Sequence, residues 1–160
     1  MFVLLRHLAT VRQTAALERG RPRSVAIRHV DAGSCNGCEH ELQAATNPYY
    51  DLQRFGLAIT PSPRHADVLL VTGPVTTRMR DALMVAYHAM PDPRLVAALG
   101  DCALGCGVLG DPDQMLGALD DILPVAIRIP GCPPTPAEIA EHLIAGLDAA
   151  RRAHDTPSAP

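Results

Sequence analysis

The segment Ala66-Asp-Val-Leu-Leu-Val-Thr-Gly-Pro74 decides the fold of this chain. Its run Val68–Thr72 is continuously apolar up to the final threonine, as is typical of a strand buried on both faces of a parallel sheet. Comparable short runs lie at residues 24–30, 57–60, 95–99 and 125–129. The chain is therefore predicted to form five strands, several of them fully buried.

Helical patterns separate these runs, at residues 39–55 (broken or kinked at Asn47-Pro48), 77–90, 113–121 and 136–152. The last of them has the clearest start, with Thr135 as N-cap, Pro136 at the first position and Glu138 completing a capping box. Alternation of strands and helices with short connections predicts an open α/β sheet, mostly parallel, with right-handed crossovers and helices on both faces. A flavodoxin-like strand order is the first choice.

The composition fits one globular domain. The chain has 160 residues, of which 48% are hydrophobic and 19% charged. Apolar residues recur at helical spacing in the first part, so we expect a short amphipathic helix over residues 1–22, an α/β domain over 23–150 and a flexible tail over 151–160.

The charge distribution is uneven. All 14 basic residues are arginine, and residues 1–30 hold six of them against one glutamate, a balance of +5 within a chain of net charge −3. Such a basic leader indicates docking to anionic lipid or to an acidic partner, although a solvated helix is the simpler interpretation. No apolar run approaches the roughly 18 residues that a membrane span needs, so we expect a cytoplasmic chain that is soluble or peripheral.

Four of the five cysteines follow strand ends. Cys35 and Cys38 come after the first strand, and Cys102 and Cys132 each come three residues after a later strand. Because the carboxyl ends of parallel strands meet at one edge of a sheet, we expect these thiols to converge there. Thiolates select iron–sulfur clusters or zinc. The nearby glycines are predicted to bring the backbone close to such a centre: Gly33, Gly37, Gly100 and Gly131.

Three other interpretations use the same cysteines. Cys35, Cys38, Cys102 and Cys106 could form a structural zinc site, because four-thiolate zinc sites use short paired spacings. The Cys35–Cys38 pair after a strand also fits a thioredoxin-like dithiol. Alternatively, the cysteines could be inert core residues. The first two leave Cys132-Pro133 without a role.

The motifs resemble one family. The segment Asp31-Ala-Gly-Ser-Cys-Asn-Gly-Cys-Glu-His-Glu41 is similar to the proximal-cluster loop of small subunits of group 4 membrane-bound [NiFe]-hydrogenases, including formate hydrogenlyase. The B subunit of respiratory complex I is a homologue of these subunits. Complex I relatives carry tandem cysteines here, so Cys-Asn-Gly-Cys favours the hydrogenase-like branch. The resemblance extends over roughly residues 25–147, through segments 47–51, 66–74, 90–93, 100–103 and 130–134.

The resemblance implies a site. By position, the ligands of one [4Fe–4S] cluster would be Cys35, Cys38, Cys102 and Cys132. Cys106 would be spare. Glu41 matches an acidic residue beside the cluster that relatives associate with proton or quinone chemistry, although an acid in the first turn of a helix is also favoured by the helix dipole.

The resemblance also implies partners. The chain would be an electron-transfer subunit of an oxidoreductase, without a complete active site of its own. A large subunit would carry the Ni–Fe or quinone site, and a ferredoxin-like iron–sulfur subunit would exchange electrons with the cluster. Membrane subunits would contact the N-terminal region, which places the complex on the cytoplasmic face of the inner membrane. Nucleic-acid binding is not expected.

Overall fold

A five-stranded sheet organises the computed structural model, which describes residues 24–107 and 112–155. The strands are β1 (Val25–Asp31), β2 (Leu57–Ile59), β3 (Val68–Thr72), β4 (Leu95–Leu99) and β5 (Ile127–Ile129). They are all parallel and lie in the order β2-β1-β3-β4-β5, which confirms the predicted fold class and the flavodoxin-like order. The order reverses between β1 and β3, where open α/β sheets bind their ligands.

Strand β3 is the centre of the molecule. It pairs with β1 on one side and β4 on the other, and all five of its residues are buried. Its side chains alternate between two cores. Leu70 packs in one apolar cluster, whereas Leu69 and Val71 pack in a second cluster on the opposite face. This two-sided burial is the reason that the run Val68–Thr72 contains no alternating pattern in the sequence.

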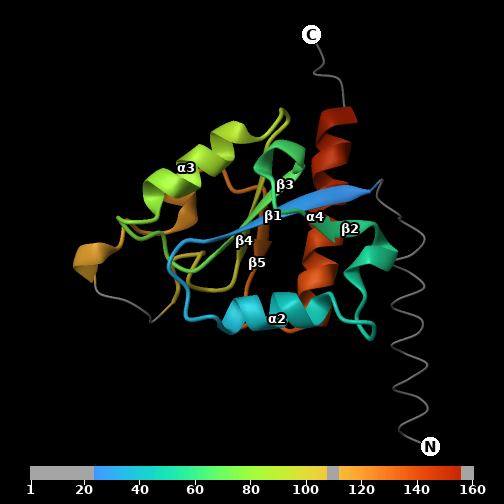
Figure 1. Ribbon diagram of the computed structural model, residues 1–160, viewed down its shortest axis with the longest axis horizontal. Helices are drawn as coiled ribbons and strands as arrows, with labels where there is room; N and C mark the ends of the chain where they lie inside the picture. Colours follow the sequence, from blue (N-terminus) through green and yellow to red (C-terminus); the bar gives the residue numbers. More distant parts are fainter. Residues whose placement is uncertain (1–23, 108–111, 156–160) are drawn as a thin grey trace, which may run out of the picture.

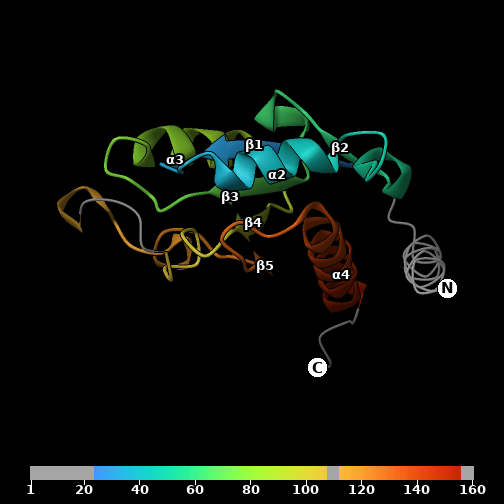
Figure 2. The same cartoon turned by 90° about the horizontal axis from the view of Figure 1, so that it is seen from below.

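Three helices cover the sheet: α2 (Gly37–Ala45), α3 (Arg80–Ala89) and α4 (Pro136–Asp155). Leu42 of α2 and Leu143 of α4 belong to the first core, whereas Leu83 of α3 belongs to the second. Accordingly, α3 and α4 lie on opposite sides of the sheet in Figures 1 and 2. Both faces are therefore covered, as predicted.

The capping box at the start of α4 is confirmed. The Thr135 N–H donates to Glu138 Oε2 at 2.8 Å, and the Glu138 N–H donates to Thr135 Oγ1 at 3.4 Å. The backbone hydrogen bond from Thr135 lowers the pKa of Glu138. The helix continues to Asp155, so the tail expected from residue 151 is helical over its first five residues.

The helix expected at residues 39–55 is broken around Asn47-Pro48, as predicted: α2 ends at Ala45, and a 3-10 turn follows at Leu52–Phe55. Pro48 disfavours helical backbone at Asn47. The Asn47 side-chain oxygen accepts the N–H groups of Tyr49 and Tyr50 at 2.8 and 3.1 Å. These hydrogen bonds form a local turn that competes with helix continuation.

The helix predicted at residues 113–121 is wrong. The structure has only two short 3-10 turns there, Pro112–Gln114 and Leu119–Asp121. From Gln114 to Leu116 the backbone pairs with the segment after β3: the Thr77 N–H donates to the Gln114 carbonyl at 2.9 Å, and the Leu116 N–H donates to the Val75 carbonyl at 2.8 Å. Backbone groups used in this way are not available for helical hydrogen bonds.

The expected N-terminal amphipathic helix, residues 1–22, lies outside the described residues. Among the helices that the structure describes, none is both long and apolar enough to cross a membrane.

Candidate metal centre

Four cysteines lie at the carboxyl edge of the sheet, as the topology predicted. Cys35 is in the loop between β1 and α2, and Cys38 is the second residue of α2. Cys102 lies in the turn after β4, and Cys132 lies in the loop after β5. Cys35 and Cys132 are exposed, whereas Cys38 and Cys102 are half-buried. Three separate loops thus bring residues that are far apart in the sequence to one surface.

Burial raises the pKa of the Cys38 thiol to about 12. Smaller contributions to this increase come from Glu39, Cys102, Cys35 and Cys132, which are therefore neighbours of Cys38. The same four cysteines were named as ligands from the resemblance. Cys106 is exposed, and its Sγ contacts the carbonyl of Leu104, within its own loop, at 3.8 Å.

The raised pKa of the Cys38 thiol bears on which kind of metal centre this site would bind. A thiolate at position 38 is costly, chiefly because burial opposes ionisation, and the neighbouring acidic groups add to this cost. Metal ligation requires the thiolate, and a bound cationic centre offsets this cost. Four converging sulfur donors match the chemistry of an iron–sulfur cluster. The described residues contain no group of three or more His, Cys, Asp or Glu side chains arranged around a single metal ion. A [4Fe–4S] cluster has a different requirement, because its ligands bind to different irons.

Glycines let the loops approach the sulfur atoms. A Cβ on Gly100 would lie only 2.4 Å from Cys38 Sγ, and one on Gly37 would lie 3.5 Å from Cys35 Sγ. Gly33 packs against Thr76, and Gly131 packs against Pro134. Three of the predicted glycines therefore lie in the cysteine loops and Gly37 begins α2, and two of the four face a sulfur directly.

The cysteine loop after β1 is held by Asp31. Its Oδ1 accepts the N–H groups of Gly33 and Ser34, at 2.8 and 2.7 Å. The Ser34 hydroxyl then accepts the Asn36 N–H at 3.1 Å. These local hydrogen bonds shape the backbone immediately before Cys35 and α2.

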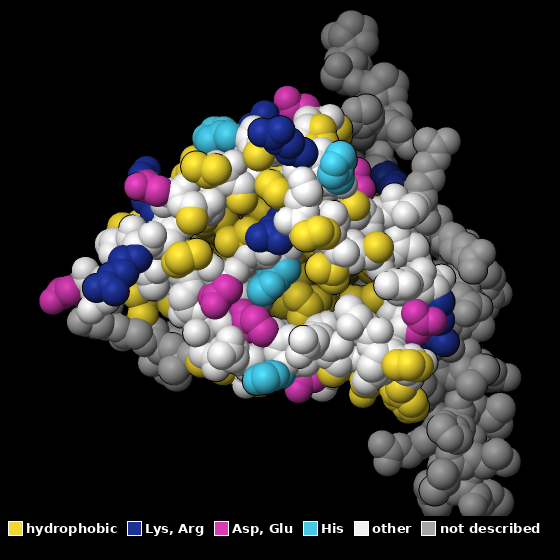
Figure 3. Space-filling view, viewed as in Figure 1, with side chains coloured by type: hydrophobic (Ala, Val, Ile, Leu, Met, Phe, Trp, Pro, Cys, Tyr) yellow, Lys and Arg dark blue, Asp and Glu magenta, His cyan; other side chains and the backbone are white. Residues whose placement is uncertain are grey.

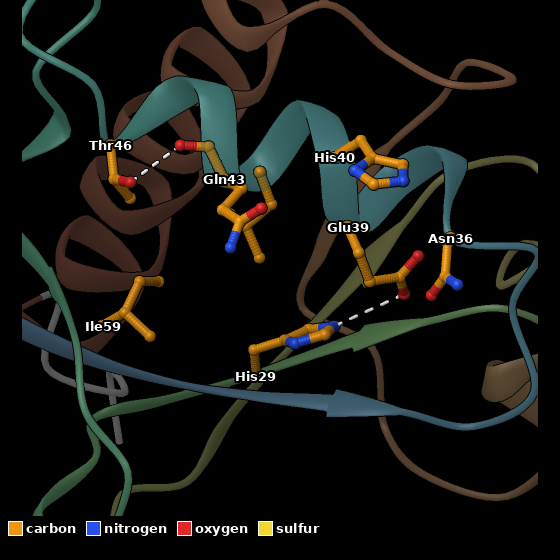
Figure 4. Close-up of a pocket in the computed structure, with 8 residues that line it drawn as sticks. His29, Asn36, Glu39, His40, Gln43, Thr46 and Ile59 are labelled. Atoms are coloured by element: carbon orange, nitrogen blue, oxygen red, sulfur yellow. Dashed lines mark hydrogen bonds and ion pairs between the residues drawn. The ribbon is translucent and has the colours of Figure 1, made fainter.

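A polar network that the sequence did not indicate lies beside Cys38. The Thr72 hydroxyl donates to Glu39 Oε1, and His29 Nε2 lies 2.9 Å from the same hydroxyl. His29 Nε2 also lies 3.6 Å from Glu39 Oε1 (Figure 4). Burial lowers the pKa of His29, which favours the neutral ring. Since Thr72 donates to Glu39, the His29 Nε2–H is the donor to Thr72 Oγ1.

Glu39, rather than Glu41, therefore connects α2 with the sheet. Glu41 is half-buried on α2, and its proposed relay role stays a prediction. The contact of Glu39 joins residues 33 positions apart, so no local spacing could have shown it. The only sequence signal was an acid in the first turn of a helix, which the helix dipole favours in any case.

A pocket of about 490 Å³ opens next to this network. It lies between α2 and the edge of the sheet, where apolar, histidine and acidic side chains are exposed together in a hollow (Figures 3 and 4). Its lining comprises His29, Asn36, Glu39, His40, Leu42, Gln43, Thr46 and Ile59.

The network should stabilise the fold. Thr72 is fully buried, so Thr72→Val would keep its shape but leave Glu39 and His29 without the hydroxyl. We expect a loss of about 1–3 kcal/mol in the free energy of unfolding, measured with urea. In a double-mutant cycle with Glu39→Met, which removes the acceptor, the two losses should be non-additive. Additive losses would show that the hydroxyl and the carboxylate do not interact.

Comparisons with known proteins show the family of this chain. Residues 35–146 match the family described as NADH ubiquinone oxidoreductase, 20 kDa subunit. A probable membrane-bound hydrogenase subunit of Pyrococcus furiosus is 44% identical over 126 residues, which are 79% of this chain and 75% of that protein. Formate hydrogenlyase subunit 7 of Escherichia coli is 46% identical over 123 residues, 77% of this chain but only 48% of that protein.

A solved structure has a similar fold. A chain of the membrane-bound sulfane sulfur reductase, an archaeal respiratory membrane complex, superposes with a TM-score of 0.66 and 32% identity, covering 86% of this chain and 73% of that one. The family match spans all four clustered cysteines, from Cys35 to Cys132. The chain belongs to the family of the 20 kDa subunit of NADH ubiquinone oxidoreductase.

Proposed function

We propose that this chain is an electron-transfer subunit that binds one [4Fe–4S] cluster through Cys35, Cys38, Cys102 and Cys132. The observation that carries the proposal is the placement of these four cysteines in three loops at the carboxyl edge of the sheet. When bound, the cluster supplies a one-electron redox centre whose potential depends on burial, net charge and hydrogen bonds to sulfur.

Different residues of this chain hold the centre, make room for it, shield it from water and position its ligands. The four cysteines hold the centre, and the glycines at positions 37 and 100 leave room for the sulfur atoms. The core beneath Cys38 limits access of water from the side of the sheet, because Cys38 packs against the apolar cluster shared by α2 and α4. Glu39 and Thr72 fix the first turn of α2 and thereby the position of Cys38.

The proposed setting is a membrane-associated oxidoreductase complex on the cytoplasmic face of the inner membrane. The exposed thiols of Cys35 and Cys132, and a hollow of about 120 Å³ beside Cys102, suit coverage by a large subunit with a Ni–Fe or quinone site. A ferredoxin-like iron–sulfur subunit would exchange electrons with the cluster. The relatives named as subunits of a membrane-bound hydrogenase and of formate hydrogenlyase support this assignment.

Residues 1–22 are proposed to contact the membrane subunits or the lipid surface. Deleting them removes four arginines, each of which contributes about 1 kcal/mol of attraction near an anionic surface. We expect the deletion to leave iron content unchanged but to release the complex from membranes at lower salt, because salt screens these charges. Sedimentation of membranes over a salt series measures the effect. A truncated chain that loses its iron or fails to fold would contradict the docking role.

Electron relay is tested by following the centre during turnover of the assembled complex. We expect the low-temperature paramagnetic resonance signal of the reduced cluster to appear after addition of reductant and to decay when acceptor is added. Both changes should be at least as fast as steady-state turnover. A signal that stays constant during turnover would contradict the relay and leave the cysteines with a structural role.

A further inference from the structure

Asp101 ties together the loops that carry two of the proposed ligands. Its Oδ1 accepts the Gly131 N–H at 2.7 Å, and its own N–H donates to the Gly131 carbonyl at 2.9 Å. Cys102 follows Asp101 directly, and Cys132 follows Gly131 directly. We propose that Asp101 is a positioning residue that sets the placement of Cys102 relative to Cys132. This inference rests on the proposed cluster ligation.

At the end of the sheet, the Asp101 carboxylate takes the place of a backbone carbonyl as the acceptor of the Gly131 N–H. The Gly100 N–H donates to the Ile129 carbonyl at 2.8 Å, so a regular parallel ladder would continue with the Gly131 N–H donating to the Gly100 carbonyl. That carbonyl instead accepts the Leu104 N–H at 3.3 Å, because the chain turns away after β4. The Asp101 side chain therefore maintains the pairing of the two loops beyond the last paired residues of β4 and β5.

The same residue also fixes its own turn. The Asp101 carbonyl accepts the Cys106 N–H at 2.8 Å, which closes the turn around Cys102. On the other side, Gly131 has a φ of +135°, and a Cβ there would lie 2.7 Å from the Pro134 backbone. The backbone of Gly131 is therefore closely packed against Pro134. A carboxylate suits the position because it only accepts hydrogen bonds and forms stronger ones with N–H donors than a neutral group does.

The variants Asp101→Asn and Asp101→Ala separate the hydrogen bond from the charge. The asparagine keeps an oxygen acceptor for Gly131, whereas the alanine keeps neither acceptor nor charge. Asp81→Asn and Asp81→Ala are matched controls, since the Asp81 side chain is 91% exposed on α3. Each variant is produced in the assembled complex, and its iron content and the rate of iron release to a chelator are measured.

We expect Asp101→Ala to release iron about tenfold faster or more, as is usual for loss of a residue that orients metal ligands. Its paramagnetic resonance line shape should change, because the geometry at Cys102 and Cys132 changes. Asp101→Asn should restore the slow release and the line shape, and both Asp81 variants should match the unsubstituted chain. Unchanged release in Asp101→Ala, or equal defects in the two Asp101 variants, would overturn the positioning role.

Amide exchange distinguishes failure of this inference from failure of the proposed function. The Gly131 N–H should be protected in the metal-free chain and in Asp101→Asn, but not in Asp101→Ala. If the unsubstituted chain binds no iron yet shows this pattern, the proposed cluster fails while the link between the loops stands. If the Gly131 N–H exchanges equally fast in the unsubstituted chain, in Asp101→Asn and in Asp101→Ala, the proposed link between Asp101 and Gly131 is overturned.

Discussion

Replacing Cys132 by serine should remove most of the iron that this chain contributes to the assembled complex, and so should serine at position 35, 38 or 102. A serine hydroxyl is a harder and much less acidic ligand than a thiol, so it does not substitute for a thiolate on iron at neutral pH. Cys106→Ser should leave iron content unchanged, because the Cys106 thiol contacts its own loop. Iron and sulfide analysis of the five purified variants measures the effect.

The metal contents of Cys106→Ser and Cys132→Ser distinguish the proposed cluster from a zinc-like site. A site built from Cys35, Cys38, Cys102 and Cys106 would lose its metal in Cys106→Ser and retain it in Cys132→Ser. That result would contradict the ligand set proposed here.

Gly100→Ala is expected to have the second large effect. Gly100 has a φ of +89°, and a Cβ there would lie 2.4 Å from Cys38 Sγ. The left-handed conformation alone costs about 1–2 kcal/mol for alanine. The contact with sulfur must in addition displace Cys38 or the turn after β4. We therefore expect reduced stability together with loss of most of the bound iron.

Gly56→Ala is the matched control for backbone strain. Gly56 has a similar φ of +81°, but it precedes β2 and thus lies at the opposite edge of the sheet from the cysteines. Both variants should unfold at lower urea concentration, whereas only Gly100→Ala should lose iron. If Gly100→Ala binds iron like the unsubstituted chain, the sulfur does not lie where the structure places it.

The sheet was predictable because burial on two faces leaves a strong mark on a sequence. The run Val68–Thr72 and its four counterparts gave the strands to within two residues. The convergence of the cysteines followed from topology, since each lies beyond the carboxyl end of a parallel strand. The prediction of a helix at residues 113–121 was wrong because the backbone there pairs with residues 75–77, which lie far away in the sequence.

The supporting residues around the site were not predictable in the same way. Glu39 and Asp101 act through hydrogen bonds to residues 33 and 30 positions away. Their partners, Thr72 and Gly131, carry no motif that points back to them. Such contacts depend on the register of neighbouring strands, which becomes known only when the sheet is assembled.

The most direct test of the central claim is to measure iron and acid-labile sulfide in two anaerobically purified complexes. One contains the unsubstituted chain, and the other contains Cys38→Ser and therefore reports only the centres of the partner subunits. The difference between them, per copy of this chain, is the content of the proposed cluster. The account predicts a difference of about four iron and about four sulfide per chain, as a [4Fe–4S] cluster requires. A difference of about one zinc without sulfide, or no difference in any metal, would contradict it.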